Sequence, residues 1–313
     1  MELDRKDLLG IEDLKKEEIE EILTTAEYME EILKRPIKKA PTLRGITVAN
    51  LFFEPSTRTL NSFVLAEKRL SADSINFSAA SSSVLKGETL LDTAKNIQAM
   101  EVDMMVVRHS SPGTPHFLAD RLESSVINAG DGCHEHPTQA LLDIMTIKKN
   151  FSSFKNLRIA IIGDIKHSRV ARSLIYGLNR MGAKVTVCAP PTLLPLWLEP
   201  LEVDFEYSLE KTLPDKDILY ILRIQKERQE ESLLPSLREY IKDYSITYNK
   251  LKSFASDEVV IMHPGPINRG VEIESNIADS EYSLILHQVS SGVAIRMSVL
   301  YLLSQRKRDG FKD

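Results

Sequence analysis

Apolar and polar residues are grouped along the chain in blocks that predict helices and strands in turn. Apolar residues recur at helical spacing from Leu14 to Leu33, which predicts a helix that has Asp13 as its N-cap and ends before Pro36. In the first half, strands are predicted at 46–53, 74–78, 103–107 and 124–129, and helices after Ser56, from Leu90 and at 137–150. In the second half, strands are predicted at 157–164, 184–189, 217–223 and 259–264, and helices at 170–181 and over the C-terminal residues around Val293–Tyr301.

Because strands alternate with helices in both halves, the chain is predicted to be an α/β protein with two domains. Each domain has a central parallel β-sheet flanked by helices. The helix at 137–150 is the predicted connection. The small polar residues at 78–86 predict a flexible loop, and the polar segment 225–250 predicts a long loop that is functional or mobile.

Composition narrows the class of protein. The 313 residues are enough for about two domains, and 42 % apolar with 27 % charged residues is typical of a globular protein. The formal net charge of −5 argues against nucleic-acid binding, and no apolar run approaches the ~18 residues of a membrane helix. Two cysteines exclude a disulfide framework, and the first residues lack the apolar core of a signal peptide, so a reducing, cytoplasmic location is expected.

A polar segment, Glu54-Pro-Ser-Thr-Arg-Thr59, stands between a predicted strand and the next helix. In open parallel sheets, ligands bind beyond the carboxyl ends of the strands. Free N–H groups at the start of a helix, neighbouring hydroxyl groups and the guanidinium of Arg58 together suit a phosphate dianion. The alternative is a plain Ser56 N-cap beside a surface arginine.

Residues 130–143, GDGCHEHPTQALLD, follow the predicted strand 124–129. Cys133, His134 and His136 are close enough in sequence to suggest a metal site. No second group of ligands accompanies them, so no metal is expected. An equally physical role for His136 is a neutral imidazole that hydrogen-bonds a substrate carbonyl.

Four arginines follow predicted strands. Residues 163–169, which end in Arg169, stand where a dinucleotide loop would, but they lack G-x-G-x-x-G and are bulky and basic. A nicotinamide-dependent oxidoreductase is therefore disfavoured.

The predicted strand 259–264 ends in the segment His263-Pro-Gly-Pro, whose prolines constrain the backbone and can present a carbonyl rigidly. The four arginines at equivalent strand ends predict one site for several negative charges: Arg58, Arg108, Arg169 and Arg223.

Together these motifs resemble the transcarbamoylases. The resemblance covers nearly the whole chain in the family's order and rests on F-E-P-S-T-R-T at 53–59, K-G-E at 86–88, H-P-T-Q at 136–139 and D-x-K-x-x-R at 164–169. Within the family, ornithine enzymes usually carry Cys in the H-P-x-Q motif and H-C-L-P in the later one, whereas this chain has Thr138 and H-P-G-P at 263–266. R-x-Q-K-E-R at 223–228 also resembles the aspartate branch.

The resemblance implies transfer of the carbamoyl group of carbamoyl phosphate to the amine of L-aspartate, a step of de novo pyrimidine biosynthesis, with no metal or organic cofactor. It implies a homotrimer with shared active sites. It also implies a carbamoyl phosphate-binding domain of residues 1–135 plus the C-terminal helix 288–313, and an aspartate-binding domain of residues 136–287.

The resemblance also implies roles for individual residues. Carbamoyl phosphate would be held by Ser56, Thr57, Arg58, Thr59, Ser82, Arg108, His136, Gln139, Pro264 and Gly265. Aspartate would be held by Lys86, Arg169, Arg223 and Gln225, and Ser82 and Lys86 would come from the neighbouring subunit. The residues implied to act in catalysis are Arg58, Thr59, Lys86, Arg108, His136 and Gln139.

Two positions depart from the usual family pattern. Leu60 stands where an arginine is usual, and Gly265 stands where better-known members carry leucine. The second departure resembles a branch that associates with dihydroorotase, so dihydroorotase is one candidate protein partner. A regulatory chain is the other candidate. The alternative functions are a transcarbamoylase with another amine acceptor, such as ornithine, and a catalytically silent scaffold of the same fold.

Overall fold

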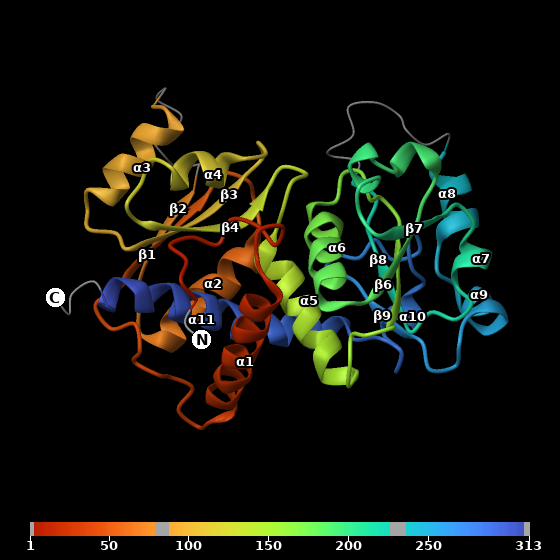
Figure 1. Cartoon of the computed structure of the whole chain (residues 1–313). Helices are drawn as coiled ribbons and strands as arrows, with labels where there is room; N and C mark the ends of the chain where they lie inside the picture. Colours follow the sequence, from red (N-terminus) through yellow and green to blue (C-terminus); the bar gives the residue numbers. More distant parts are fainter. Residues whose placement is uncertain (1–2, 79–87, 226–235, 310–313) are drawn as a thin grey trace. The chain divides into compact units, whose positions relative to one another are not determined.

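The structure is a computed structural model that describes residues 3–78, 88–225 and 236–309. The chain divides into two compact units. The first unit consists of Met1–Leu142 and Ser290–Asp313, and the second consists of Asp143–Val289. Each unit contains one parallel β-sheet, which confirms the α/β architecture predicted from the alternation of strands and helices (Figure 1).

The sheet of the first unit has the strand order β2-β1-β3-β4, and all neighbouring pairs are parallel. The strands are β1 (Thr47–Phe52), β2 (Asp73–Ser78), β3 (Met104–His109) and β4 (Ser125–Asp131). The helices are α1 (Lys16–Lys34), α2 (Thr57–Leu70), α3 (Leu90–Gln98) and α4 (Thr114–Ala119), with the start of α5 (Pro137–Asn150) and most of α11 (Ile285–Asp309).

Helices cover both faces of this sheet (Figure 1). Ala49, Leu51 and Val107 point toward α3 and α4 and form a buried cluster with Ile97 and Leu118. The other face carries α1, α2 and α11 (Figure 1). Because both faces are covered, β1 is buried along almost its whole length, as parallel strands usually are.

The sheet of the second unit has the order β7-β6-β5-β8-β9, again with parallel neighbours. Its strands are β5 (Arg158–Ile162), β6 (Lys184–Cys188), β7 (Val203–Glu206), β8 (Ile218–Ile221) and β9 (Val260–Met262). Helix α6 (Arg169–Met181) lies on the opposite side of this sheet from α7 (Leu209–Thr212), α8 (Leu237–Tyr244) and α9 (Tyr248–Phe254), and α10 (Ser275–Ala278) adds Ile277 and Ala278 to the buried cluster (Figure 1).

Two predictions about local structure are wrong. The first helix begins at Lys16 with Lys15 as its N-cap, not Asp13, because the Glu18 carboxylate accepts the Lys15 N–H at 2.7 Å and so completes the first turn. The segment 225–250 is not one long loop, since α8 and the start of α9 occupy much of its described part and are capped by Ser236 and Thr247. The predicted loop at 78–86 lies almost entirely outside the described residues.

Over the described parts of the chain, no helix combines the length and the apolar character needed to cross a bilayer. The two cysteines are free thiols: Cys188 is buried and Cys133 is half-buried.

Candidate active site

In the first unit, the carboxyl ends of three neighbouring strands bring the predicted phosphate-binding segments together. The Phe53 N–H donates to the Arg108 carbonyl at 2.9 Å, which joins the end of β1 to the end of β3. The Gly132 N–H donates to the His109 carbonyl at 2.9 Å, which joins β3 to the segment after β4. The segments at 54–59, 108–111 and 131–136 therefore lie at one edge of the sheet, as the rule for parallel sheets predicts.

Helix α2 begins within the first of these segments, with Ser56 as its N-cap. Among the described residues, the Ser56 hydroxyl accepts none of the first N–H groups of the helix. Thr57 and Arg58 are exposed, and Thr59 is half-buried. Since the first turn also contains no acidic residue, this helix end presents N–H groups, hydroxyls and a guanidinium of the kind that binds a dianion.

Arg108 is held in place at the end of β3 by two hydrogen bonds. Its Nη2 donates to Oε1 of Glu54 at 3.0 Å, and its Nη1 donates to the Ala129 carbonyl at 3.0 Å. The side chain is 12 % exposed, so the guanidinium is fixed beside the segment that contains Arg58 rather than extended into solvent. A planar guanidinium held in this way is suited to a bidentate anion.

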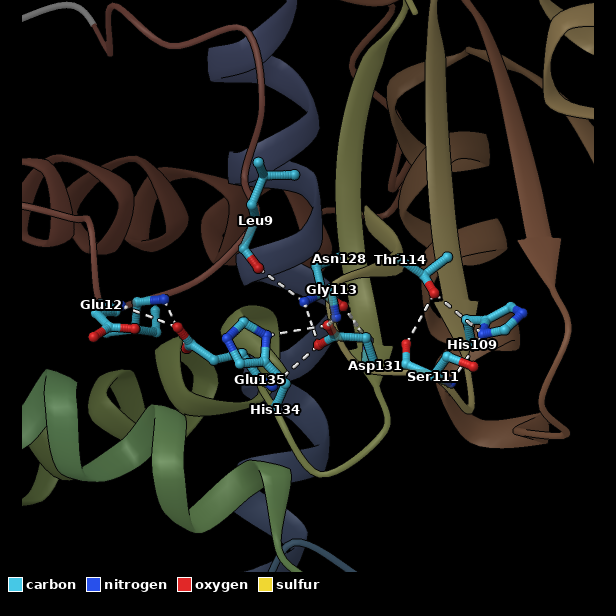
Figure 2. A network of polar contacts seen from close by, with 12 residues as sticks. Leu9, Glu12, His109, Ser111, Gly113, Thr114, Asn128, Asp131, His134 and Glu135 are labelled. Atoms are coloured by element: carbon cyan, nitrogen blue, oxygen red, sulfur yellow. Dashed lines mark hydrogen bonds and ion pairs between the residues drawn. The ribbon is translucent and has the colours of Figure 1, made fainter. Parts of the chain in front are cut away.

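Asp131, at the end of β4, organises the loop that leads to His136 (Figure 2). Its Oδ2 accepts the Gly113 N–H at 2.7 Å, and its Oδ1 accepts the Glu135 N–H at 3.0 Å and the Asn128 amide at 2.9 Å. Nδ1 of His134 lies 3.1 Å from Oδ2. One fully buried carboxylate thus joins β4, the loop before α4 and the segment before α5.

These contacts also set the charge of Asp131. Burial of the carboxylate opposes its ionisation, but the hydrogen bonds from His134 and Asn128, the charge of His134 and the Gly113 N–H outweigh burial. The pKa of Asp131 therefore lies below its ordinary value, and the group is a carboxylate at neutral pH.

His136 follows this loop directly and is buried, with 4 % of its surface exposed. Its carbonyl accepts the Gln139 N–H at 3.0 Å and so starts helix α5, whose first residue is Pro137. The half-buried Gln139 lies in the first turn of that helix. His136 and Gln139, two of the residues that the resemblance assigns to carbamoyl phosphate, are therefore neighbours at one helix end.

The structure adds a histidine that sequence spacing did not associate with this loop. His116 of α4 lies beside His134 with ring centroids 5.5 Å apart, and ligand atoms of His116, Asp131 and His134 lie within 4.8 Å of one another. Both Asp131 oxygens already accept backbone N–H groups, so this cluster is a hydrogen-bonding network in the structure and we assign no metal to it. Cys133 and His136 belong to neither potential metal group found among the described residues.

In the second unit, Asp164 joins two of the predicted aspartate-binding segments. It follows β5, is fully buried, and its Oδ2 accepts the Gln225 N–H at 3.1 Å from the segment after β8. Its Oδ1 lies 2.8 Å from Nδ1 of His167. Arg169 is the first residue of α6 and is 2 % exposed, whereas Arg223 and Gln225 are half-buried.

His263 organises the turn that follows β9. Its Nδ1 accepts the Gly265 N–H at 2.8 Å, so a neutral ring carries its proton on Nε2, which lies 3.2 Å from Oε1 of Glu272. The same Glu272 oxygen accepts the Asn268 N–H at 2.6 Å. These bonds fix the backbone on both sides of Pro264, which is half-buried, as is Gly265.

Two of the predicted site residues, Ser82 and Lys86, lie outside the described residues. Two residues that support the site, Asn128 and Asp131, were given no role from the sequence. Asp131 could have been found by the rule that polar residues at strand ends serve the site, since it ends β4. Asn128 lies inside a buried strand, where only its contacts reveal its role.

Two family models match the chain along most of its length. Residues 6–149 match the aspartate/ornithine carbamoyltransferase carbamoyl-P binding domain, and residues 155–303 match the Asp/Orn binding domain of the same family. The chain therefore belongs to the aspartate/ornithine carbamoyltransferase family.

Individual relatives agree with this assignment. The chain is 55 % identical over 306 residues to the aspartate carbamoyltransferase catalytic subunit of Syntrophobacter fumaroxidans, covering 98 % of this chain and 100 % of the relative. It resembles Trypanosoma cruzi aspartate transcarbamoylase in complex with N-(phosphonacetyl)-L-aspartic acid with a TM-score of 0.86, 30 % identity and 94 % of each chain covered. It also resembles Pyrococcus furiosus ornithine carbamoyltransferase with a TM-score of 0.86 and 29 % identity, covering 96 % of this chain and 98 % of that one.

Replacing Asp131 by Asn tests its role as the anchor of the loop before His136. An amide turns one acceptor oxygen into a donor that faces backbone N–H groups, so we expect a loss of about 3 kcal/mol in the free energy of unfolding at pH 7. Because the folded-state pKa of Asp131 is lowered, the wild-type advantage is present above the ordinary carboxyl pKa and is lost as the pH falls below about 4. Denaturant unfolding at several pH values measures this difference.

Asp120→Asn is the matched control, because Asp120 is an exposed carboxylate of the same unit. It is expected to change the free energy of unfolding by less than about 0.5 kcal/mol. Equal stability of the Asp131 and Asp120 variants at pH 7 would contradict the anchoring role.

Proposed function

We propose that this chain transfers the carbamoyl group of carbamoyl phosphate to the amine of L-aspartate, giving N-carbamoyl-L-aspartate and phosphate. The observation that carries the proposal is the placement of arginines at the carboxyl ends of parallel strands in both sheets. Arg58 and Arg108 occupy these positions in the first unit, and Arg169 and Arg223 occupy them in the second. The product places the reaction in pyrimidine biosynthesis.

The charge of the substrates explains the number of arginines. Carbamoyl phosphate and aspartate are both dianions, so bringing them together assembles roughly four negative charges that repel each other. Guanidinium groups remain protonated at any physiological pH and bind phosphates and carboxylates through two parallel hydrogen bonds. Four such groups match the charge that the reaction must assemble.

In the first unit, the start of α2 holds the phosphate through Ser56, Thr57, Arg58 and Thr59. Arg108 contacts both the phosphate and the carbonyl oxygen, and His136 donates to the same oxygen. Gln139 binds the carbamoyl amide, and we assign the same role to the Pro264 carbonyl, with Gly265, of the second unit. The observed fixation of Arg108 by Glu54 and Ala129 supports this, because a positioned guanidinium loses little entropy when the substrate binds.

In the second unit, Arg169, Arg223 and Gln225 bind the carboxylates of aspartate. The hydrogen bond between Asp164 and the Gln225 N–H supports this, because it brings the segment after β8 to the loop before α6. Ser82 contacts carbamoyl phosphate, and Lys86 contacts both substrates; both residues come from the neighbouring subunit of a homotrimer.

The chemical step needs no covalent intermediate, since carbamoyl phosphate is already activated. The neutral amine of aspartate attacks the carbamoyl carbon, and Thr57, Arg108 and His136 stabilise the negative charge that develops on the carbonyl oxygen. The C–O bond to phosphate then breaks, and the leaving phosphate accepts the proton that the amine loses. Positioning of the two reactants supplies up to ~7–11 kcal/mol of the lowering of the barrier.

The choice of aspartate over ornithine rests on sequence rather than on fold. The solved aspartate and ornithine enzymes resemble this chain equally well, with TM-scores of 0.86 each. The identity of 55 % to a relative named as an aspartate carbamoyltransferase catalytic subunit and the pair Arg223 and Gln225 favour an acidic acceptor. We place the enzyme in the cytoplasm, with dihydroorotase and a regulatory chain as candidate partners.

Arg58→Ala tests the phosphate site. Removing a charge-assisted donor that contacts the transferring group is expected to lower kcat/KM by about 10²–10³ while leaving the unfolding midpoint close to that of the wild type. The measurement is the rate of carbamoyl-aspartate formation by the purified chain. Arg44→Ala, which removes an exposed arginine of the same unit, is the control and is expected to retain full activity. Near-normal turnover by the Arg58 variant would refute the assigned role.

Mixing two inactive variants tests whether sites are shared between subunits. Arg58→Ala and Lys86→Ala are each expected to have little activity alone, because each lacks one side of every site. After dissociation and reassembly together, mixed trimers contain some sites with both residues intact, so part of the activity returns. If subunit exchange is verified by mass labelling and activity does not return, Lys86 does not act across a subunit boundary.

A further inference from the structure

A buried hydrogen-bonded chain leads from the middle of α5 to the turn after β9. Asp143 of α5 is fully buried, and its Oδ2 accepts the Tyr220 hydroxyl of β8 at 2.7 Å. Its Oδ1 accepts Nε2 of Gln288, on α11, at 2.7 Å. Oε1 of Gln288 in turn accepts the N–H of His263 at 2.9 Å, at the first residue of the turn.

The nitrogen and the oxygen of the Gln288 side-chain amide must each face a different kind of hydrogen-bonding group. The carboxylate of Asp143 can only accept, so Nε2 must face it, and the backbone N–H of His263 can only donate, so Oε1 must face that. A rotated amide would place a donor against a donor and an acceptor against a carboxylate. Gln288 is 2 % exposed, so water cannot replace either bond without opening the core.

The turn is therefore held from two sides. Gln288 fixes the backbone of His263, and the His263 ring fixes the Gly265 N–H and reaches Glu272. Pro264 lies between these two fixed points, and the proline ring already limits its φ angle. The direction of its carbonyl is thus determined by contacts on both of its neighbours.

We propose that Asp143 and Gln288 are positioning residues that fix the direction of the Pro264 carbonyl, the group to which the proposed function assigns the amide of the carbamoyl group. This inference rests on the proposed function. Neither residue belongs to the unit that contains the phosphate-binding segment 56–59. We therefore expect the pair to affect recognition of the carbamoyl end of the substrate and not recognition of its phosphate. Asp143 and Gln288 act through the turn and need not touch a substrate.

The place of the two residues in the chain makes them suited to this task. Asp143 is the first residue of the second unit and Gln288 is the second-last, so they lie next to the two points where the chain passes between the units. They are 145 residues apart in sequence and belong to two helices of 14 and 25 residues. The Asp143–Gln288 hydrogen bond joins these two helices, and the His263–Gln288 hydrogen bond joins the turn to them.

Gln288→Met is the decisive variant, because methionine has a similar length and shape but offers neither bond. We expect the KM for carbamoyl phosphate to rise about tenfold, with kcat changed less than threefold, since a binding contact is weakened in the ground state and the transition state alike. The inhibition constant of inorganic phosphate is expected to stay within twofold, because phosphate has no amide. A general collapse of the site would raise both constants together.

Two further variants keep the test valid if methionine prevents folding. Gln288→Asn keeps a buried amide that is too short to reach Asp143 and His263 together, so the same rise in KM is expected. Asp143→Asn can keep both of its contacts, with Oδ1 toward Gln288 and the amide toward the Tyr220 oxygen, so it is expected to preserve the KM. Circular dichroism and the unfolding midpoint establish that each variant folds.

Tyr220→Phe is the matched control for the loss of a buried hydrogen bond. It removes a bond to the same Asp143 carboxylate but leaves the path from Asp143 through Gln288 to His263 intact. It is expected to lower the unfolding midpoint while leaving the KM within twofold. A KM that follows the loss of stability in every variant would overturn the positioning role.

The wild-type assay separates this inference from the function on which it rests. A wild-type chain that forms no carbamoyl-aspartate overturns the proposed function and the positioning role with it. An active wild type whose Gln288 variants keep the same KM for carbamoyl phosphate overturns the positioning role alone. An active wild type with a raised KM and an unchanged phosphate inhibition constant in these variants supports both.

Discussion

Buried carboxylates that accept backbone N–H groups are the interaction on which the loops of the candidate site depend. Asp131 holds the loop before His136, Asp164 holds the segment that contains Gln225, and Glu272 holds the turn after His263. All three carboxylates are at most 1 % exposed. A carboxylate can accept several hydrogen bonds at once, so one side chain can fix a loop that has no regular secondary structure. Without these anchors, His136, Gln225 and Pro264 would stand on segments with no defined geometry.

Buried carboxylates and guanidinium groups have different roles in this arrangement. Removing a carboxylate from water is costly unless it is well hydrogen-bonded, and here that cost is offset by N–H groups that would themselves be unsatisfied without it. The guanidinium groups differ in exposure: Arg58 is exposed, Arg223 is half-buried, and Arg169 is buried. Buried anions that accept N–H groups fix the backbone, and the guanidinium groups it carries are the attractive partners for two dianionic substrates.

The sequence predicts the elements whose signals are local. Strand β1 and helices α2 and α5 follow from apolar runs and from Ser56 and Pro137 at the helix starts. The prediction of Asp13 as the N-cap is wrong because Glu18 accepts the Lys15 N–H and also pairs with Arg5. The start of the helix therefore depends on a contact between residues 13 positions apart. The sequence predicts a loop at 225–250 because α8 and α9 are short and mostly polar.

Supporting residues whose contacts are distant in sequence could not be predicted. Glu135 accepts the N–H of Ile11, 124 residues away, and Gln288 reaches Asp143 over 145 residues. Neither pair leaves a periodic or spaced pattern in one sequence. The arginines were recognisable because the rule that ligands bind at the carboxyl ends of parallel strands turns a position in the sequence into a position in space.

The most direct test of the central claim is carbamoyl transfer by the purified chain alone, with aspartate and ornithine supplied in parallel as acceptors. The arginines of the second unit, Arg169 and Arg223, predict turnover of the acidic acceptor, with formation of N-carbamoyl-L-aspartate and little or no citrulline. Turnover of ornithine in preference to aspartate would contradict the roles given to Arg223 and Gln225. No turnover of either acceptor by the folded chain would contradict the claim that its own residues complete the site.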